Sequence, residues 1–230
     1  MTLREIAAVK TARYAVVGAE DGPADHVWMA CHGYGQLVPY FARHFGAVGA
    51  PGRLVVVPEA LSRFYVGDPA AGGRRVGASW MTREAREADI ADTVRYLDDV
   101  FVAACARADA DPHTVALSGF GFSQGTATVV RWLDQSPVLA ARGRRAERLV
   151  LWGGGLPHDF DAGAAWLAET PVVLVAGDRD GFATPARVIE QEGRLAAAGV
   201  PHRTRTFPGE HRLNDRVLRE VVNERPDRGA

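Results

Sequence analysis

Gly121, Ser123 and Gly125 form the pattern G-x-S-x-G, in which a serine can act as a nucleophile. The pattern follows a strand-like run and precedes a helix-like one, TATVVRWL. A serine in such a turn takes strained backbone angles, and a Cβ on either flanking glycine would collide with the neighbouring strand or helix. A glycine-rich turn whose serine only caps a helix would give the same letters. The position between strand and helix favours the catalytic interpretation.

A serine nucleophile needs a base and an acid, which follow a turn of this kind in the order acid, then histidine. Of the three histidines after Ser123, His211 lies in a loop just beyond a predicted strand, where its side chain can reach the serine. The run PVVLVAGDRDGFATP ends a strand in two aspartates, and Asp180 lies in the turn beyond the strand. We therefore predict a triad of Ser123, Asp180 and His211. Asp178 is expected to brace that turn as a hydrogen-bond acceptor.

The letters H-G-Y-G at residues 32–35 end an early predicted strand and can expose backbone amides. An oxyanion hole needs two N–H groups that point at one position, and we predict those of Tyr34 and Gln124, the latter being the residue after the nucleophile. Trp80 and Phe182 are predicted to line the substrate pocket with Tyr34. The sequence has no H-E-x-x-H and no clustered histidines and carboxylates, so no metal is expected.

The elements that must hold these residues alternate between strands and helices. Short β-branched runs are separated by stretches with helical spacing, which predicts an α/β fold with a mostly parallel sheet covered on both faces by helices, in one domain over residues 1–230. A long helix is expected from Arg83 to about Ala108 with Thr82 as its N-cap. The predicted strands are residues 27–33, 54–60, 114–121, 148–155, 171–178 and 202–207.

Two further segments bear on the site. Thr184 and Pro185 are an N-cap and a first helical residue, which open a helix that ends near Gly199. The stretch from Leu61 to Met81 is too glycine-rich for a regular element. It is interpreted either as a wall of the active site or as a surface loop pinned by its aromatic residues.

The chain resembles the small phospholipase/carboxylesterase and acyl-protein thioesterase group of α/β hydrolases. The matching pieces are H-G-Y-G at residues 32–35, G-F-S-Q-G at 121–125, G-D-R-D at 177–180 and the late His211. The resemblance implies a lidless enzyme with the α/β-hydrolase fold, which cleaves esters or thioesters without a cofactor. The group commonly has leucine where Tyr34 stands and a D-P-x-V-P turn where residues 180–185 read DGFATP, so the acyl pocket is not carried over.

Composition limits the other function classes. A net charge of −1 and a pI near 6.7 give no field that would attract nucleic acid or an anionic membrane. The arginine cluster at residues 142–148 is interpreted as a solvated loop and helix end, with nucleic-acid binding as the weaker alternative. Charged residues interrupt the opening 18 residues, so no signal peptide is expected and the predicted location is cytoplasmic. Cys31 and Cys105 are expected to be buried free thiols.

These observations predict a serine esterase for small-molecule esters with small to medium, uncharged acyl chains, because no basic cluster is evident at the motif loops. A thioesterase or another acyl transferase on the same triad is the first alternative. A ligand-binding protein that keeps the fold without turnover is the second. The sequence makes no prediction of the oligomeric state.

Overall fold

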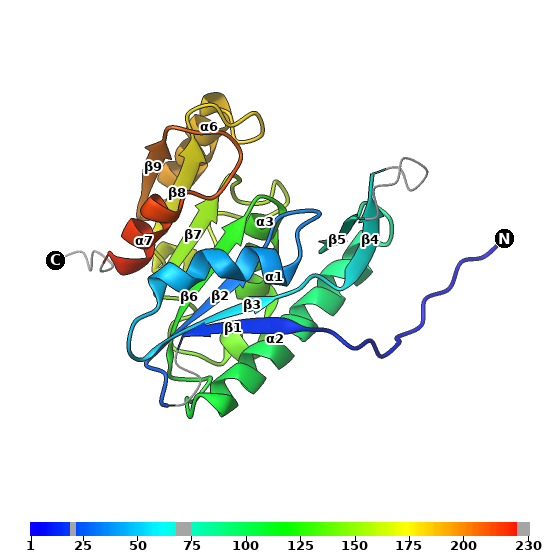
Figure 1. The fold of residues 1–230 in the computed structure, drawn as a ribbon. Coiled ribbons are helices and arrows are strands. Elements are labelled where there is room, and N and C mark those ends of the chain that lie inside the picture. Colours follow the sequence, from blue (N-terminus) through cyan, green and yellow to red (C-terminus); the bar gives the residue numbers. More distant parts are fainter. Residues whose placement is uncertain (19–21, 68–74, 225–230) are drawn as a thin grey trace.

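The computed structural model of the chain describes residues 1–18, 22–67 and 75–224. Seven strands form one sheet in the order β1-β3-β2-β6-β7-β8-β9, and β4 and β5 form a separate antiparallel pair (Figure 1). The strands are β1 (Tyr14–Gly18), β2 (His26–Cys31), β3 (Arg53–Pro58), β4 (Ser62–Val66), β5 (Arg75–Ser79), β6 (Ala116–Phe122), β7 (Arg148–Trp152), β8 (Val172–Gly177) and β9 (His202–Phe207).

The helices lie on both faces of the main sheet (Figure 1). They are α1 (Val38–Phe41), the 3-10 helix η1 (Ala42–Val48), α2 (Arg86–Arg107), α3 (Gln124–Gln135), α4 (Pro137–Ala140), α5 (Ala165–Ala168), α6 (Pro185–Ala197) and α7 (Asp215–Asn223). One face packs in a cluster with α2 and α3, and the other packs with α1, η1 and α7. Side chains that alternate along β2 enter the two clusters in turn, as Val27 and Trp28 do. The predicted two-sided α/β architecture is confirmed.

Strand direction explains how distant residues come together. In the main sheet β1 runs antiparallel to β3, and every other pairing is parallel. The carboxyl ends of parallel strands meet at one edge of a sheet, where the loops that follow them form ligand sites. The loops after β2, β6, β7, β8 and β9 carry H-G-Y-G, Ser123, residues 153–155, Asp180 and His211. All of the predicted chemistry therefore belongs to one edge.

The stretch from Leu61 to Met81 was predicted to form no regular element. That prediction is wrong in part, because described residues of the stretch form the antiparallel pair of β4 and β5. Residues 68–74 of that stretch lie outside the described residues. The predicted N-cap at Thr82 is also wrong. The hydroxyl of Thr82 accepts the N–H of Glu84 at 3.2 Å, and α2 begins after Ala85, whose φ is 44°. The cap at Thr184 is confirmed, since its side chain accepts the N–H of Arg187.

The arginine cluster at residues 142–148 is bound to the protein, contrary to the solvated loop that the sequence suggested. Arg148 is buried in β7 and donates to carbonyl oxygens of the α7 region, Val221 and Glu224. Arg142 and Arg145 also donate to backbone carbonyl oxygens. These side chains thus fix chain ends and turns.

Cys31 and Cys105 are buried and unpaired, as expected. Burial raises the pKa of the Cys105 thiol to about 11 and raises the pKa of Cys31 further. Both side chains therefore remain neutral thiols at physiological pH.

Candidate active site

Ser123 occupies the turn between β6 and α3. Its backbone angles are φ 54° and ψ −117°, a region that residues other than glycine rarely adopt. A Cβ on Gly121 would lie 2.4 Å from the carbonyl oxygen of Gly125, and one on Gly125 would lie 2.1 Å from that of Cys31. The collisions predicted for the flanking glycines are therefore confirmed. The close approach of helix and strand holds Ser123 in its strained conformation, where it is partly exposed.

Asp180 and His211 are joined by a hydrogen bond of 2.8 Å between Oδ2 and Nδ1. Asp180 is 4% exposed, and its Oδ1 accepts the N–H groups of Phe182 and Ala183, each at 2.8 Å. Because an ionised carboxylate only accepts hydrogen bonds, Nδ1 of His211 is the donor and its Nε2 keeps a lone pair. This is the tautomer that a general base needs.

Asp178, the rejected candidate for the acid, has a different partner. Its Oδ1 accepts the N–H of Gly209 at 2.8 Å, and the N–H of Arg179 donates to the carbonyl of the same glycine at 2.9 Å. These bonds tie the turn after β8 to the loop after β9. Asp178 therefore braces the segment that carries His211, while Asp180 contacts the imidazole itself.

Aromatic rings locate His211 next to the serine turn. The ring of Phe122, the residue before Ser123, stacks on the imidazole with a centroid distance of 4.9 Å, and the ring of Phe182 lies 4.7 Å away. A Cβ on Gly153 would lie 2.9 Å from Cε1 of His211, so the missing side chain permits this approach. Phe182 is 66% exposed and covers the histidine, at the edge where the sequence predicted a substrate contact.

The H-G-Y-G loop uses the amides on either side of Tyr34 for its own structure. The N–H of Gly33 donates to Oε1 of Gln36 at 2.8 Å, and that of Gly35 donates to the carbonyl of Ala78 at 2.8 Å. Within the described part of the chain, the N–H of Tyr34 has no such acceptor. The N–H of Gln124 is one of the amides that a helix leaves unpaired in its first turn. The two predicted oxyanion donors are therefore available.

His32 and Trp80 hold the H-G-Y-G loop in place through hydrogen bonds. His32 is fully buried and donates from Nδ1 to the carbonyl of Gly33 at 2.8 Å, while its Nε2 accepts the N–H of Ala60 at 3.0 Å. Burial lowers the pKa of His32, so its imidazole stays neutral. The indole N–H of Trp80 donates to the carbonyl of His32 at 2.8 Å.

Trp80 is 2% exposed and packs in the core, so the predicted contact of its ring with substrate is not what the structure shows. Its backbone instead helps to orient Gln124. Oε1 of Gln124 accepts the N–H of Trp80 at 3.2 Å, and Nε2 donates to the carbonyl of Met81 at 3.0 Å. The segment after the β4–β5 hairpin therefore fixes the residue that follows the serine. This supports the interpretation that the end of the Leu61–Met81 stretch, residues 79–81, belongs to the site.

Two cavities flank the Ser123 turn. The first has a volume of about 260 Å³ and lies beside Phe182, with one wall made of the glycines at 153–155. Residues of β8 make an apolar wall, whereas α6 contributes mostly polar side chains, Arg187, Glu190 and Gln191. The second has a volume of about 410 Å³ and begins at Gln124. His158 borders both cavities.

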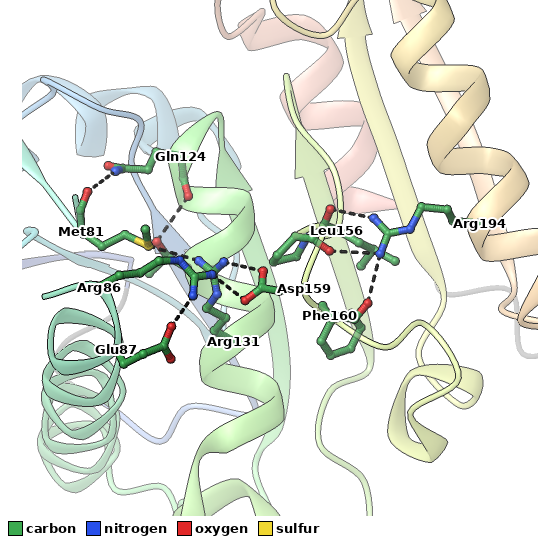
Figure 2. Close-up of polar contacts among 11 residues, drawn as sticks. Met81, Arg86, Glu87, Gln124, Arg131, Leu156, Asp159, Phe160 and Arg194 are labelled. Atoms are coloured by element: carbon green, nitrogen blue, oxygen red, sulfur yellow. Dashed lines mark hydrogen bonds and ion pairs between the residues drawn. The ribbon is translucent and has the colours of Figure 1, made fainter. Parts of the chain in front are cut away.

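Sequence reasoning missed the charged groups of the second cavity, Arg86, Arg131 and Asp159. Figure 2 shows the two guanidinium groups side by side against the carboxylate of Asp159. Arg131 follows Gln124 by seven residues, so helical spacing places both on one face of α3. That spacing was the available signal. The sequence analysis expected no basic cluster at the motif loops, and this arginine pair lies on α2 and α3, at a cavity that begins at Gln124.

Within the described residues, no three histidine, cysteine or acidic side chains come together as metal ligands. Over the same residues, no helix has the length and apolar character needed to cross a membrane.

Known structures share the architecture of this chain. Esterase PE8 is 20% identical, with a TM-score of 0.63 over 93% of this chain and 97% of its own. Zea mays acyl-protein thioesterase 2 is 17% identical, with a TM-score of 0.63 over 92% and 96% of the two chains. The Bacillus cereus carboxylesterase is 15% identical, with a TM-score of 0.63 over 92% of each chain. No protein-family model and no curated protein matches the sequence.

At these identities the likeness concerns the fold, and the chain has the α/β-hydrolase fold. Its structural neighbours include esterases, a carboxylesterase and an acyl-protein thioesterase, the group that the motifs around residues 32–35 and 121–125 resemble.

Proposed function

We propose that this protein is a serine hydrolase that cleaves carboxylic esters, with Ser123 as the nucleophile, His211 as the base and Asp180 as the acid. The hydrogen bond between Asp180 and His211 carries the proposal, because it holds the imidazole in the tautomer whose Nε2 can take a proton. The strained turn at Ser123 and the ring contact between Phe122 and His211 support the same assignment.

The chemistry follows two steps. His211 takes the proton of Ser123 as the serine oxygen attacks the ester carbonyl, and the oxyanion receives hydrogen bonds from the amides of Tyr34 and Gln124. The protonated imidazole then gives its proton to the alcohol as the alcohol leaves. In the second step a water molecule, activated by the same His211, hydrolyses the acyl-enzyme. We propose that neither metal nor cofactor takes part, so EDTA should leave the rate unchanged.

The cavity beside Phe182 supports a preference for small to medium acyl chains. Its volume of about 260 Å³ is below the usual range for drug-sized ligands. Its wall at residues 153–155 has no side chains, while Leu174 and Val188 supply apolar surface beside the polar side chains of α6. A short chain fills such a space, whereas a chain of sixteen carbons would extend across the surface. Measuring kcat/KM for nitrophenyl esters of two to sixteen carbons tests this, and a maximum at the long end contradicts it.

Labelling with a fluorophosphonate tests the mechanism most directly. The wild-type protein should be labelled at Ser123 and lose esterase activity, and Ser123→Ala should be neither labelled nor active. The matched control is Ser62→Ala, at the exposed start of β4, which should leave both labelling and activity intact. A folded wild-type protein that fails to react would favour the ligand-binding alternative.

Thioester cleavage is the second candidate, because one structural neighbour is an acyl-protein thioesterase. The same triad attacks either carbonyl. Hydrolysis rates for an oxygen ester and a sulfur ester with the same acyl chain separate the two candidates.

A further inference from the structure

The second cavity runs along one face of α3, away from the Ser123 turn. Gln124, Ala127, Thr128 and Arg131 line it at helical spacings of three, four and seven residues. Met81 and Pro157 contribute apolar walls from other segments. Because Gln124 carries a proposed oxyanion donor at one end, an ester held there would direct one of its arms into this cavity.

The far end of the cavity is charged. Arg131 and Arg86 share one carboxylate, Asp159, and the cavity lining has no other acidic residue among those described. Glu87 also pairs with Arg86, but it lies outside the lining. The lining therefore holds two cations and one anion, in a place where the side chain of Arg131 is 11% exposed and that of Asp159 is 51% exposed.

The hydrogen bonds of Arg131 leave room for a second acceptor. Its Nη2 donates to Asp159 at 2.9 Å, whereas its Nη1 faces the sulfur of Met81 at 3.4 Å (Figure 2). A thioether is a weak acceptor, and a carboxylate is a strong one for a guanidinium. A carboxylate that entered the cavity would therefore replace a poor contact with a charge-assisted hydrogen bond.

We propose that this cavity receives one arm of the ester substrate when that arm ends in a carboxylate, which Arg131 and Arg86 bind. The inference rests on the proposed ester hydrolysis and names a substrate class for it. Seven residues of helix separate Gln124 from Arg131 by about 10 Å, a length that an extended chain of roughly eight bonds spans. The apolar walls at Met81 and Ala127 suit the methylene groups of such a chain.

Two pairs of matched esters test the proposal. The first pair carries the terminal group on the acyl arm, as nitrophenyl monoesters of octanedioic acid with the far end either a carboxylate or a primary amide. The second pair carries it on the alcohol arm, as butyrate esters of 8-hydroxyoctanoic acid and of its amide. In at least one pair, the wild-type kcat/KM should be about tenfold higher for the carboxylate, and the preference should shrink at high salt.

Variants show where the preference arises. Arg131→Gln should abolish it while the amide ester is still hydrolysed, and Arg131→Lys should retain part of it. Asp159→Asn should increase it, because it removes the competing anion. Arg95→Gln, on the exposed surface of α2, is the matched control and should change nothing. Thermal melting confirms that each variant is folded.

The results separate this inference from the proposed function. Equal rates for carboxylate and amide esters, with both lost in Ser123→Ala, would leave the esterase standing and overturn the carboxylate subsite. An Arg131→Gln variant that slows hydrolysis of both esters equally would also overturn the subsite, because that result indicates that Arg131 only holds the local structure together. If no ester is hydrolysed, the proposed function fails. Calorimetric binding of the same esters to Ser123→Ala then decides whether the cavity still selects the carboxylate.

Discussion

The backbone N–H of Ala60 donates a hydrogen bond to Nε2 of His32 at 3.0 Å, which joins the loop after β3 to the loop after β2. The sequence analysis treated His32 only as the first residue of the H-G-Y-G turn. In the structure its imidazole uses both nitrogens, since Nδ1 bonds the carbonyl of Gly33. A buried histidine thus holds the chain on which Tyr34 presents its amide.

Replacing His32 should therefore weaken both fold and activity. His32→Ala leaves the N–H of Ala60 buried without its partner, at a cost of about 1–3 kcal/mol in the free energy of unfolding. Urea unfolding measures this loss, and His113→Ala, at an exposed position, is the control. The rate should also fall, mostly in kcat, because the amide of Tyr34 would be less well held. An unchanged unfolding midpoint would contradict this role.

The two aspartates after β8 should respond differently to the same substitution. Asp180→Asn replaces the acceptor for Nδ1 of His211 and should lower kcat by about 10³–10⁴-fold, as loss of the correct imidazole tautomer does in serine proteases. Asp178→Asn alters only the contact with Gly209 and should cost far less activity. Steady-state kinetics on one nitrophenyl ester compares the two variants. A damaging Asp178→Asn beside a nearly normal Asp180→Asn would reverse the assignment.

His26 should make the fold sensitive to acid. Burial, with smaller effects of Arg53 and Arg148, lowers the pKa of His26 to about 4, and its Nε2 lies 2.8 Å from the hydroxyl of Ser118. Because the unfolded chain binds this proton near pH 6.5, stability is complete above that pH and falls as pH drops toward 4, by on the order of 3 kcal/mol.

Urea unfolding of the wild type and of His26→Gln at about pH 8, 6, 5 and 4.5 measures that effect. The wild type should lose more stability than the variant over the acidic range, and the difference between the two should be constant above about pH 7. Parallel pH profiles for both proteins would show that another group is responsible.

Gly125→Ala tests the packing of the serine turn. The new Cβ would lie 2.1 Å from the carbonyl oxygen of Cys31, which is backbone and cannot rotate away. We expect a loss of at least about 3 kcal/mol in unfolding free energy, or no folded protein. Gly143→Ala, where no heavy atom lies within 4 Å, is the control and should be close to neutral. Denaturant unfolding and soluble yield provide the readouts.

Local sequence patterns mark each of the residues that the sequence analysis selected for the triad. Ser123 is identified by its glycines, and Asp180 and His211 by their positions just beyond strands. Parallel strands then bring those positions to one edge without further information. The choice between Asp178 and Asp180 also came from position relative to the strand end, and the hydrogen bond to His211 agrees with it.

What the sequence missed depends on partners distant in the chain or on weak patterns. The strand β4 is exposed on one face and only half-buried on the other, and its residues SRFYV show no apolar alternation that would reveal it. Trp80 packs in the core, where its indole donates to a carbonyl 48 residues away, and Arg131 pairs with a carboxylate 28 residues away. Thr82 failed as a cap because the left-handed Ala85 delays the start of α2.

The glycines at residues 153–155 make one wall of the smaller cavity, and they limit how that cavity can evolve. A Cβ at each position in turn would lie 2.9 Å from His211, 2.6 Å from Thr126 and 2.5 Å from Gln191. A side chain added to this wall therefore displaces the side chain of His211, Thr126 or Gln191 together with the cavity. New substrate preferences can instead arise at other residues of the lining, such as Val188 in α6, whose substitution leaves this wall in place.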